Sequence, residues 1–94
     1  MMKVEGDLLR LEGPLTMATA GALLDAGRRQ VAAADRVIDL TAVSTADSAA
    51  LALLFDWLRT ARANGRRLTV RGLPEGLRSL AALYGAEALL PLEV

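Results

Sequence analysis

The chain of 94 residues contains no cysteine and no histidine. Without cysteine it can form no disulfide, thiolate nucleophile or thiolate metal site. Without histidine it lacks the usual base of serine-type triads and the commonest zinc ligand. Its only lysine, Lys3, lies beside the N-terminus, which argues against a Ser-Lys dyad or a Schiff base. We therefore expect a protein that is not an enzyme, with no catalytic residue, no cofactor and no metal.

The chain also lacks an excess of charge and a long hydrophobic run. Eleven Lys and Arg residues balance eleven Asp and Glu residues, so the basic surface typical of a nucleic-acid-binding protein is missing. The longest uninterrupted apolar run, from Ala49 to Phe55, is too short to cross a membrane. The first seven residues carry acids and no signal-peptide hydrophobic segment. These features predict a soluble, cytoplasmic protein with no nucleic-acid partner and no direct membrane insertion.

Aromatic residues are scarce as well, at 3% of the chain, whereas hydrophobic residues make up 53%. A core must therefore be filled mainly by leucine and alanine. The length is that of one domain, and a chain this short buries enough surface for one core only. We therefore predict a single domain over residues 1–94.

Strand-like segments alternate with helix-like ones. Residues 4–12 predict a β-hairpin with its turn at Gly6-Asp7, ended by Gly13-Pro14. Further strands are predicted over residues 36–40 and 67–71, with a last short one over 92–94. Residues 41–46 are expected to form the loop after the strand that precedes them. Alternating strands and helices predict an α/β fold, a sheet with helices packed on it.

Three helices are expected between these strands. The first begins at a Thr16 cap and carries apolar residues at helical spacing, namely Met17, Ala20, Leu24 and Val31. The longest runs from Asp47 or Ser48 to about Asn64-Gly65, where glycine favours the left-handed stop. The third carries Leu77, Leu80, Ala81 and Tyr84 on one face and ends at Gly85. In this reading Tyr84 is a core residue and Asp25 pairs with Arg28 or Arg29.

The segment from Val37 to Leu51 contains two informative motifs. Asp39-Leu40-Thr41 ends a predicted strand, and Asp47-Ser48-Ala49-Ala50-Leu51 opens the longest helix. These motifs resemble those of the STAS domain family, although this chain has Ala50 where the family usually has glycine. The resemblance covers nearly the whole chain. It implies the STAS fold, a small mixed β-sheet with helices packed on it.

Two other stretches are similar to one branch of that family. They are Leu51 to Leu54 and the tail from Leu77 to Gly85, followed by Leu89-Leu90-Pro91. The branch comprises the small STAS subunits of Mla-type phospholipid-transport ABC complexes. This similarity implies a non-catalytic accessory subunit that binds the cytoplasmic ATPase at the inner face of the inner membrane, in a system involved in outer-membrane lipid asymmetry. The alternative is an anti-sigma factor antagonist that binds an anti-sigma factor kinase.

The resemblance implies that Ser48 is the site of phosphorylation or partner contact. Physical chemistry is compatible with this role, because a helix N-terminus tolerates a phosphate or an acidic group. The alternative from the residues alone is that Asp47 or Ser48 simply caps the helix. Thr45, Asp47, Ala52, Phe55 and Arg59 complete the predicted partner-binding surface.

Helical spacing divides the longest helix into two faces. The face assigned to the sheet carries Ala50, Leu51, Leu54, Leu58 and Ala61. The neighbouring face, expected to be largely solvated, carries Ser48, Ala52, Phe55, Arg59 and Arg62. Phe55 among arginines is typical of a protein interface, or else it lies at the margin of the core. Trp57 is predicted to be core, and Asp39 to accept a hydrogen bond from a loop N–H.

Overall fold

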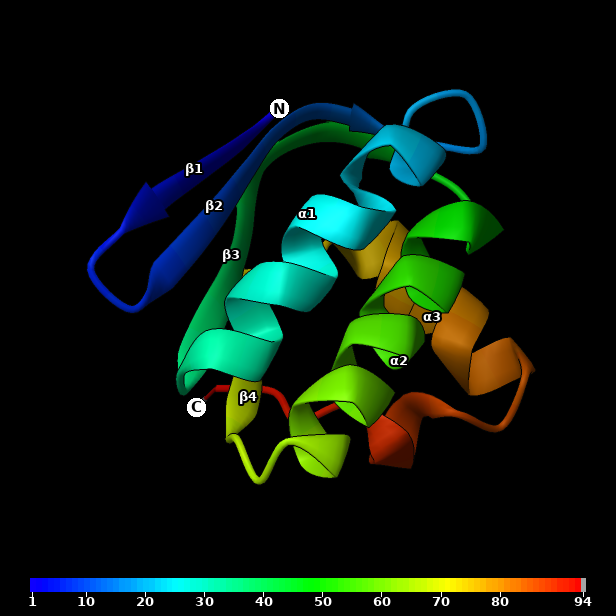
Figure 1. The fold of residues 1–94 in the computed structure, drawn as a ribbon. Helices are drawn as coiled ribbons and strands as arrows, with labels where there is room; N and C mark the ends of the chain where they lie inside the picture. The colour runs from blue at the N-terminus through cyan, green and yellow to red at the C-terminus, as the bar shows by residue number, and fades with distance from the viewer. Residues whose placement is uncertain (94) are drawn as a thin grey trace.

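The structure, a computed structural model, describes residues 1–93 of the chain (Figure 1). Four strands, three α-helices and a short 3₁₀ turn follow one another along the sequence. The elements are β1 (Met2–Glu5), β2 (Leu8–Leu15), α1 (Ala20–Ala33), β3 (Arg36–Ala46), α2 (Ser48–Ala63), β4 (Leu68–Arg71), α3 (Glu75–Leu83) and η1 (Glu87–Leu89). The predicted α/β class, a small mixed sheet with helices packed on it, is confirmed.

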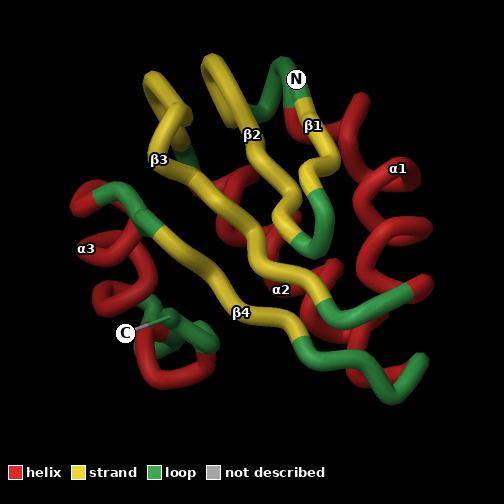
Figure 2. Tube along the Cα trace, turned by 90° about the vertical axis from the view of Figure 1, so that its left-hand side faces the viewer, coloured by secondary structure: helices red, strands yellow, loops and turns green. Residues whose placement is uncertain are grey.

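The sheet has the strand order β1-β2-β3-β4. β1 and β2 form the predicted antiparallel hairpin, whereas β2, β3 and β4 are parallel to one another. Helices α1 and α2 make the two crossovers between parallel strands. Because such crossovers are right-handed and each leads to the next strand on the same side, both helices pack on one face of the sheet. Figure 2 shows the other face toward the viewer, with the described helices behind or beside the strands.

The core lies between the sheet and the helices. Alternate strand residues point into it, including Leu9, Ile38, Leu40 and Val70. From α2 the whole set assigned to the sheet is buried, together with Leu53 and Trp57. The two predicted faces of this helix are therefore confirmed, as is the core position of Trp57.

Helices α1 and α2 approach closely because a glycine faces a tryptophan. Trp57 has no exposed surface, and its indole Nε1 donates a hydrogen bond to the Leu24 carbonyl at 3.0 Å. The ring lies against Gly27, where a Cβ atom would overlap it. The sequence predicts Trp57 as a core residue but does not indicate Gly27 as its partner, because a glycine within a helix has no apolar side chain to count.

Strand β3 is longer than predicted, and the expected loop over residues 41–46 is wrong. These residues pair in parallel with β2, which itself continues past Gly13-Pro14 to Leu15. The register shifts twice along this pairing, which is typical of bulged strands. Hydrogen bonding to a neighbouring strand fixes the backbone here, although the side chains of residues 41, 44 and 45 are exposed and show no buried alternation.

The first helix begins at Ala20 rather than at Thr16. A turn precedes it, in which the N–H groups of Thr19 and Ala20 donate to the Thr16 carbonyl at 3.0 and 2.8 Å. Met17 therefore lies outside the helix and is 79% exposed, so its assignment to the apolar face is wrong. The Thr16 hydroxyl accepts from the N–H of Ala18 within this turn instead of capping a helix.

The C-terminal part corrects two further predictions. Tyr84 is 64% exposed and not a core residue, because α3 ends at Leu83 and Gly85 adopts a positive φ of 68°. Of the predicted strand over 92–94, Leu92 forms an isolated parallel bridge to Val70, and Val94 lies outside the described residues. Within residues 1–93, no helix has the length and apolar character needed to cross a membrane.

The open face of the sheet carries a buried carboxylate. Asp39 is 3% exposed and stands in register between Arg10 of β2 and Arg71 of β4. Its Oδ1 accepts from the backbone N–H and the hydroxyl of Thr41 at 2.9 and 2.8 Å, and Arg10 Nε lies 3.7 Å from Oδ2. The predicted bond from a backbone N–H is therefore present, but its donor belongs to β3 and not to a loop. Burial alone would raise the pKa of Asp39, but these hydrogen bonds and the two arginines outweigh it and lower that pKa.

This lowered pKa predicts acid sensitivity. An unfolded aspartate titrates near 3.9, so the ionised Asp39 stabilises the fold above about pH 4, and this contribution is lost as the pH falls toward its lower folded pKa. Asp39→Asn should cost roughly 1–2 kcal/mol at pH 7, since the charge beside Arg10 is removed. Urea unfolding measures the free energy of unfolding at pH 7 and at pH 3. Between these two pH values that free energy should fall less for the variant than for the parent protein. An equal fall in the variant and in the parent protein would contradict the stabilising role of the ionised Asp39.

Candidate partner-binding site

Asp47 fixes the start of helix α2. Its Oδ1 accepts from the N–H of Ala49 at 2.9 Å, which is an N-cap bond. Its Oδ2 accepts from the N–H of Met17 at 3.0 Å, which ties the turn before α1 to the same point. Asp47 therefore ties the start of α2 to the turn before α1, and its predicted part in partner binding stays a prediction.

Asp47→Ala should destabilise the protein by about 1–2 kcal/mol, because it removes the N-cap of α2 and the hydrogen bond from Met17 in the turn before α1. Ser48→Ala is the matched control. The Ser48 side chain is exposed and makes no hydrogen bond within residues 1–93, so this change should stay within about 0.5 kcal/mol. Thermal melts of the two variants test the assignment. Equal losses would mean that Ser48 shares in capping.

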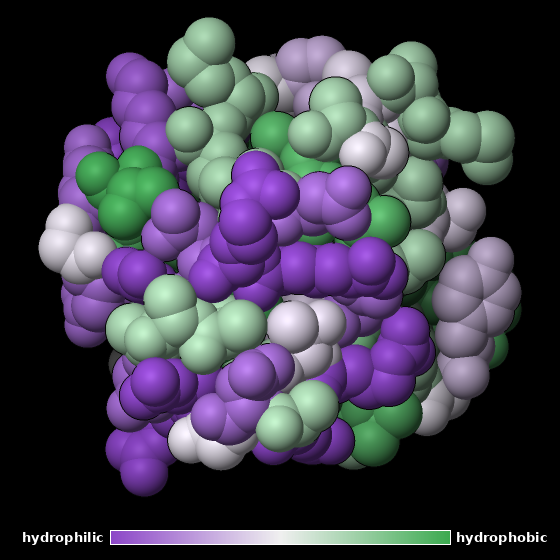
Figure 3. All heavy atoms as spheres, in the orientation of Figure 1, coloured by the Kyte–Doolittle hydropathy of each residue, from purple (hydrophilic) through white to green (hydrophobic). Residues whose placement is uncertain are grey.

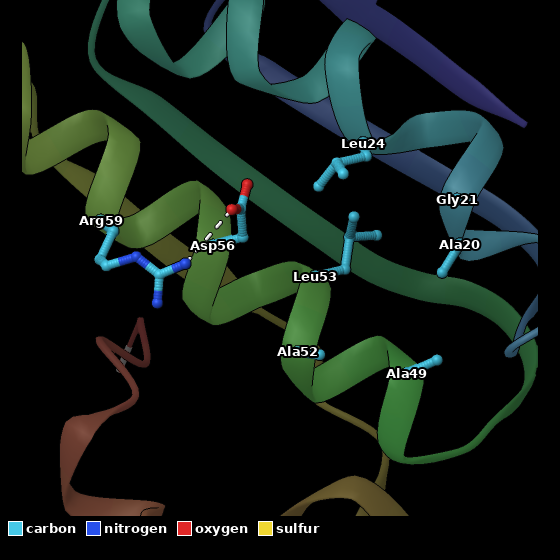
Figure 4. Close-up of a pocket in the computed structure, with 8 residues that line it drawn as sticks. All are labelled: Ala20, Gly21, Leu24, Ala49, Ala52, Leu53, Asp56 and Arg59. Atoms are coloured by element: carbon cyan, nitrogen blue, oxygen red, sulfur yellow. Dashed lines mark hydrogen bonds and ion pairs between the residues drawn. The ribbon is translucent and has the colours of Figure 1, made fainter.

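A groove of about 300 Å³ lies between the first turns of α1 and the part of α2 from Ala49 to Arg59. Figure 4 shows side chains of the two helices facing one another across it. Most of them are small or apolar, which keeps the groove open. Its lining consists of Ala20, Gly21, Leu24, Ala49, Ala52, Leu53, Asp56 and Arg59.

Charged residues close one end of the groove. Asp56 accepts two hydrogen bonds from Arg28 of α1, from Nε and Nη2 at 2.8 Å each, and Arg59 Nη2 lies 3.3 Å from the same carboxylate. The bonds from Arg28 lower the pKa of Asp56 and exceed the opposing effect of its burial. Arg28 also pairs with Asp25 at 3.6 Å, as predicted. Figure 3 shows hydrophilic groups in a band across α1 and α2, with hydrophobic surface above it.

The structure brings together only part of the predicted surface. Ala52 and Arg59 line the groove, and Ser48 is exposed beside Ala49 at the start of α2. Thr45 is exposed near the end of β3, two residues before the cap. Phe55 is half-buried at the margin of the core and does not line the groove. The roles of these residues in binding stay predictions.

The contribution of α1 to the groove was not predicted. Ala20, Gly21 and Leu24 form one wall, but nothing in the sequence marks them as facing α2. The pairing of Asp56 with Arg28 was missed too, because the two residues are 28 positions apart. A small, mostly apolar groove with one ion-pair cluster can bind a protein side chain or short segment. It presents no pair of free acids or nucleophile with a base.

Comparison with known proteins identifies the family. The family described as "Mlab, STAS domain" matches residues 2–91. The chain belongs to this family of STAS domains. No curated protein matches the sequence.

Solved structures agree on the fold. A candidate anti-sigma factor antagonist from Thermotoga maritima superposes with a TM-score of 0.74 at 15% identity, covering 98% of this chain and 83% of that one. The anti-sigma factor antagonist SpoIIAA, in its unphosphorylated form, gives 0.68 at 13% identity, covering 88% and 81%. A protein named Mglu gives 0.62 at 29% identity, covering 80% of this chain and 19% of that one. The same fold thus occurs in chains of similar size and in a small part of a larger one.

Proposed function

We propose that this protein is a non-catalytic accessory subunit that docks on the cytoplasmic ATPase of an Mla-type phospholipid-transport ABC complex. The family match over residues 2–91, whose description names MlaB, supports this choice. The observation that carries a docking role is the groove between α1 and α2, with Ser48 exposed near one end. Its partner would hold it at the inner face of the inner membrane, in a system that maintains outer-membrane lipid asymmetry.

The groove suits docking better than chemistry. Its walls are mainly alanine, glycine and leucine, and its one carboxylate, Asp56, is already bound by two arginines. Such a surface offers apolar burial for a partner side chain and an exposed guanidinium, Arg59, for a partner acid. The purified protein is accordingly expected to show no nucleotide hydrolysis of its own.

A second function is favoured by the structural neighbours. Two of them are described as anti-sigma factor antagonists, one in its unphosphorylated form. Under this alternative the partner is an anti-sigma factor kinase, and phosphorylation of Ser48 regulates binding. A phosphate there would lie at the N-terminus of the 16-residue helix α2, where the dipole favours negative charge but close packing of a partner would be blocked.

Direct binding separates the two functions. The purified protein is titrated by calorimetry against the Mla-type ATPase of the same organism and, separately, against its serine-kinase anti-sigma factors. Binding to the ATPase alone supports the accessory subunit. Binding to a kinase, followed by ATP-dependent modification of Ser48 and release, would support the antagonist instead.

A further inference from the structure

The two edge strands of the sheet differ in whether another segment hydrogen-bonds to their outer side. At β4 the C-terminal segment covers the edge, since Val70 N–H donates to the Pro91 carbonyl at 2.9 Å and its own carbonyl accepts from Glu93 N–H at 2.7 Å. At β1, no residue among 1–93 pairs with the outer side of the strand. Figure 1 shows β1 as the outermost strand. An uncovered edge is a template for pairing with another strand.

The hydrogen-bond phase of the hairpin shows which groups this edge presents. Met1 and Glu12 exchange both main-chain bonds, at 2.8 and 2.9 Å. Such pairs alternate along an antiparallel ladder, so Lys3 and Glu5 also direct their main-chain groups toward β2. Met2 and Val4 therefore direct their N–H and C=O groups outward.

We propose that β1 pairs antiparallel with β1 of a second copy of this chain, joining two sheets around a two-fold axis at Val4. In this register Val4 faces Val4 of the other copy, and Lys3 faces Glu5 in both directions. Opposite charges directly across a strand pair are attractive. One other register near the middle of the strand also lets the outward main-chain groups of the two copies pair. It places Lys3 opposite Lys3, and like charges in that position repel.

The side chains of β1 fit this arrangement. Val4 is 49% exposed and lies on the helix side of the sheet, because it pairs with the buried Leu9. Figure 3 shows an exposed hydrophobic patch over the β1–β2 hairpin, bordered by hydrophilic groups. Pairing with a second copy would cover Val4 on both chains. The zero net charge of the chain removes long-range repulsion between copies.

Dimer formation is independent of the proposed function, because β1 contributes nothing to the α1–α2 groove. Sedimentation velocity over a range of concentrations should show the wild-type protein shifting from 9.9 kDa toward twice that mass. Lys3→Glu and Glu5→Lys each place like charges opposite one another, so each alone should dimerise about tenfold more weakly or worse. An equimolar mixture of the two variants restores both attractive pairs and should dimerise again.

Val4→Pro supplies a second test. It removes an outward N–H without breaking a bond to β2, so the fold should hold while dimerisation is lost. Thermal melts confirm that each variant is folded; the existing pairs of Lys3 with Glu12 and of Glu5 with Arg10 are exposed and contribute little to stability. A wild-type protein that stays monomeric at every concentration would overturn the proposal. So would a dimer that Val4→Pro leaves intact, or a mixture that does not associate.

Discussion

Replacing Gly27 with alanine is expected to destabilise the folded protein by about 3 kcal/mol, the upper end of the usual cost of overpacking. The new Cβ would overlap the Trp57 ring, which is fully buried and fixed by its bond to the Leu24 carbonyl. Neither helix can move away without breaking that bond or opening the core. Urea unfolding followed by tryptophan fluorescence measures the loss.

Gly76→Ala is the matched control for this prediction. Gly76 is exposed in α3, and a Cβ there meets nothing within 4 Å. Alanine lowers the conformational entropy of the unfolded chain, so less entropy is lost on folding. This change should therefore stabilise the protein by about 0.4–1 kcal/mol. The two substitutions are chemically identical and should therefore have opposite signs. Stabilisation by both would show that α1 and α2 do not pack through Gly27.

A double mutant tests whether the cost of Gly27→Ala comes from its contact with Trp57. In a Trp57→Phe background the smaller ring leaves room beside Gly27, so the cost of Gly27→Ala should shrink. A coupling free energy between the two positions is the expected result, since residues in contact are not additive. Additive losses would place the strain elsewhere.

The second large effect is expected on binding. Ser48→Glu adds bulk and negative charge at the start of α2, and Ala52→Arg fills the groove. Each should weaken binding to the proposed ATPase partner about 30-fold or more if the groove holds an interface hot spot. Stability should hold, because both side chains are exposed and an acid in the first turn favours the helix dipole. Calorimetric titration and thermal melts measure the two quantities.

Ala63→Arg is the matched control for Ala52→Arg. Ala63 is exposed on the same helix, eleven residues and about 16 Å further along, on nearly the same side. Its substitution should leave binding unchanged. Full binding by the folded Ser48 and Ala52 variants would place the docking surface elsewhere on the molecule.

Several features were predictable because they depend on local pattern. The apolar spacing of residues 50–61 determined which face of α2 is buried, and Gly65 marked its end with a positive φ of 69°. The hairpin followed from its turn at Gly6-Asp7. The Asp47-Ser48 motif indicated the helix start around which the candidate site lies. Each signal lies within one continuous stretch of at most twelve residues, where helical periodicity and turn geometry are enough to indicate the outcome.

Other features depended on contacts between distant segments. Residues 41–46 became strand because β2 supplied hydrogen-bond partners, and Tyr84 became exposed because α3 ends one residue before it. The groove itself required α1 to face α2, which the close contact of Gly27 with Trp57 permits. Local sequence pattern was therefore enough for the class of fold, the order of the main elements and the start of α2. It could not show which second helix completes the site, or which sheet edge residues 1–93 leave uncovered, because both depend on packing between residues far apart in the chain.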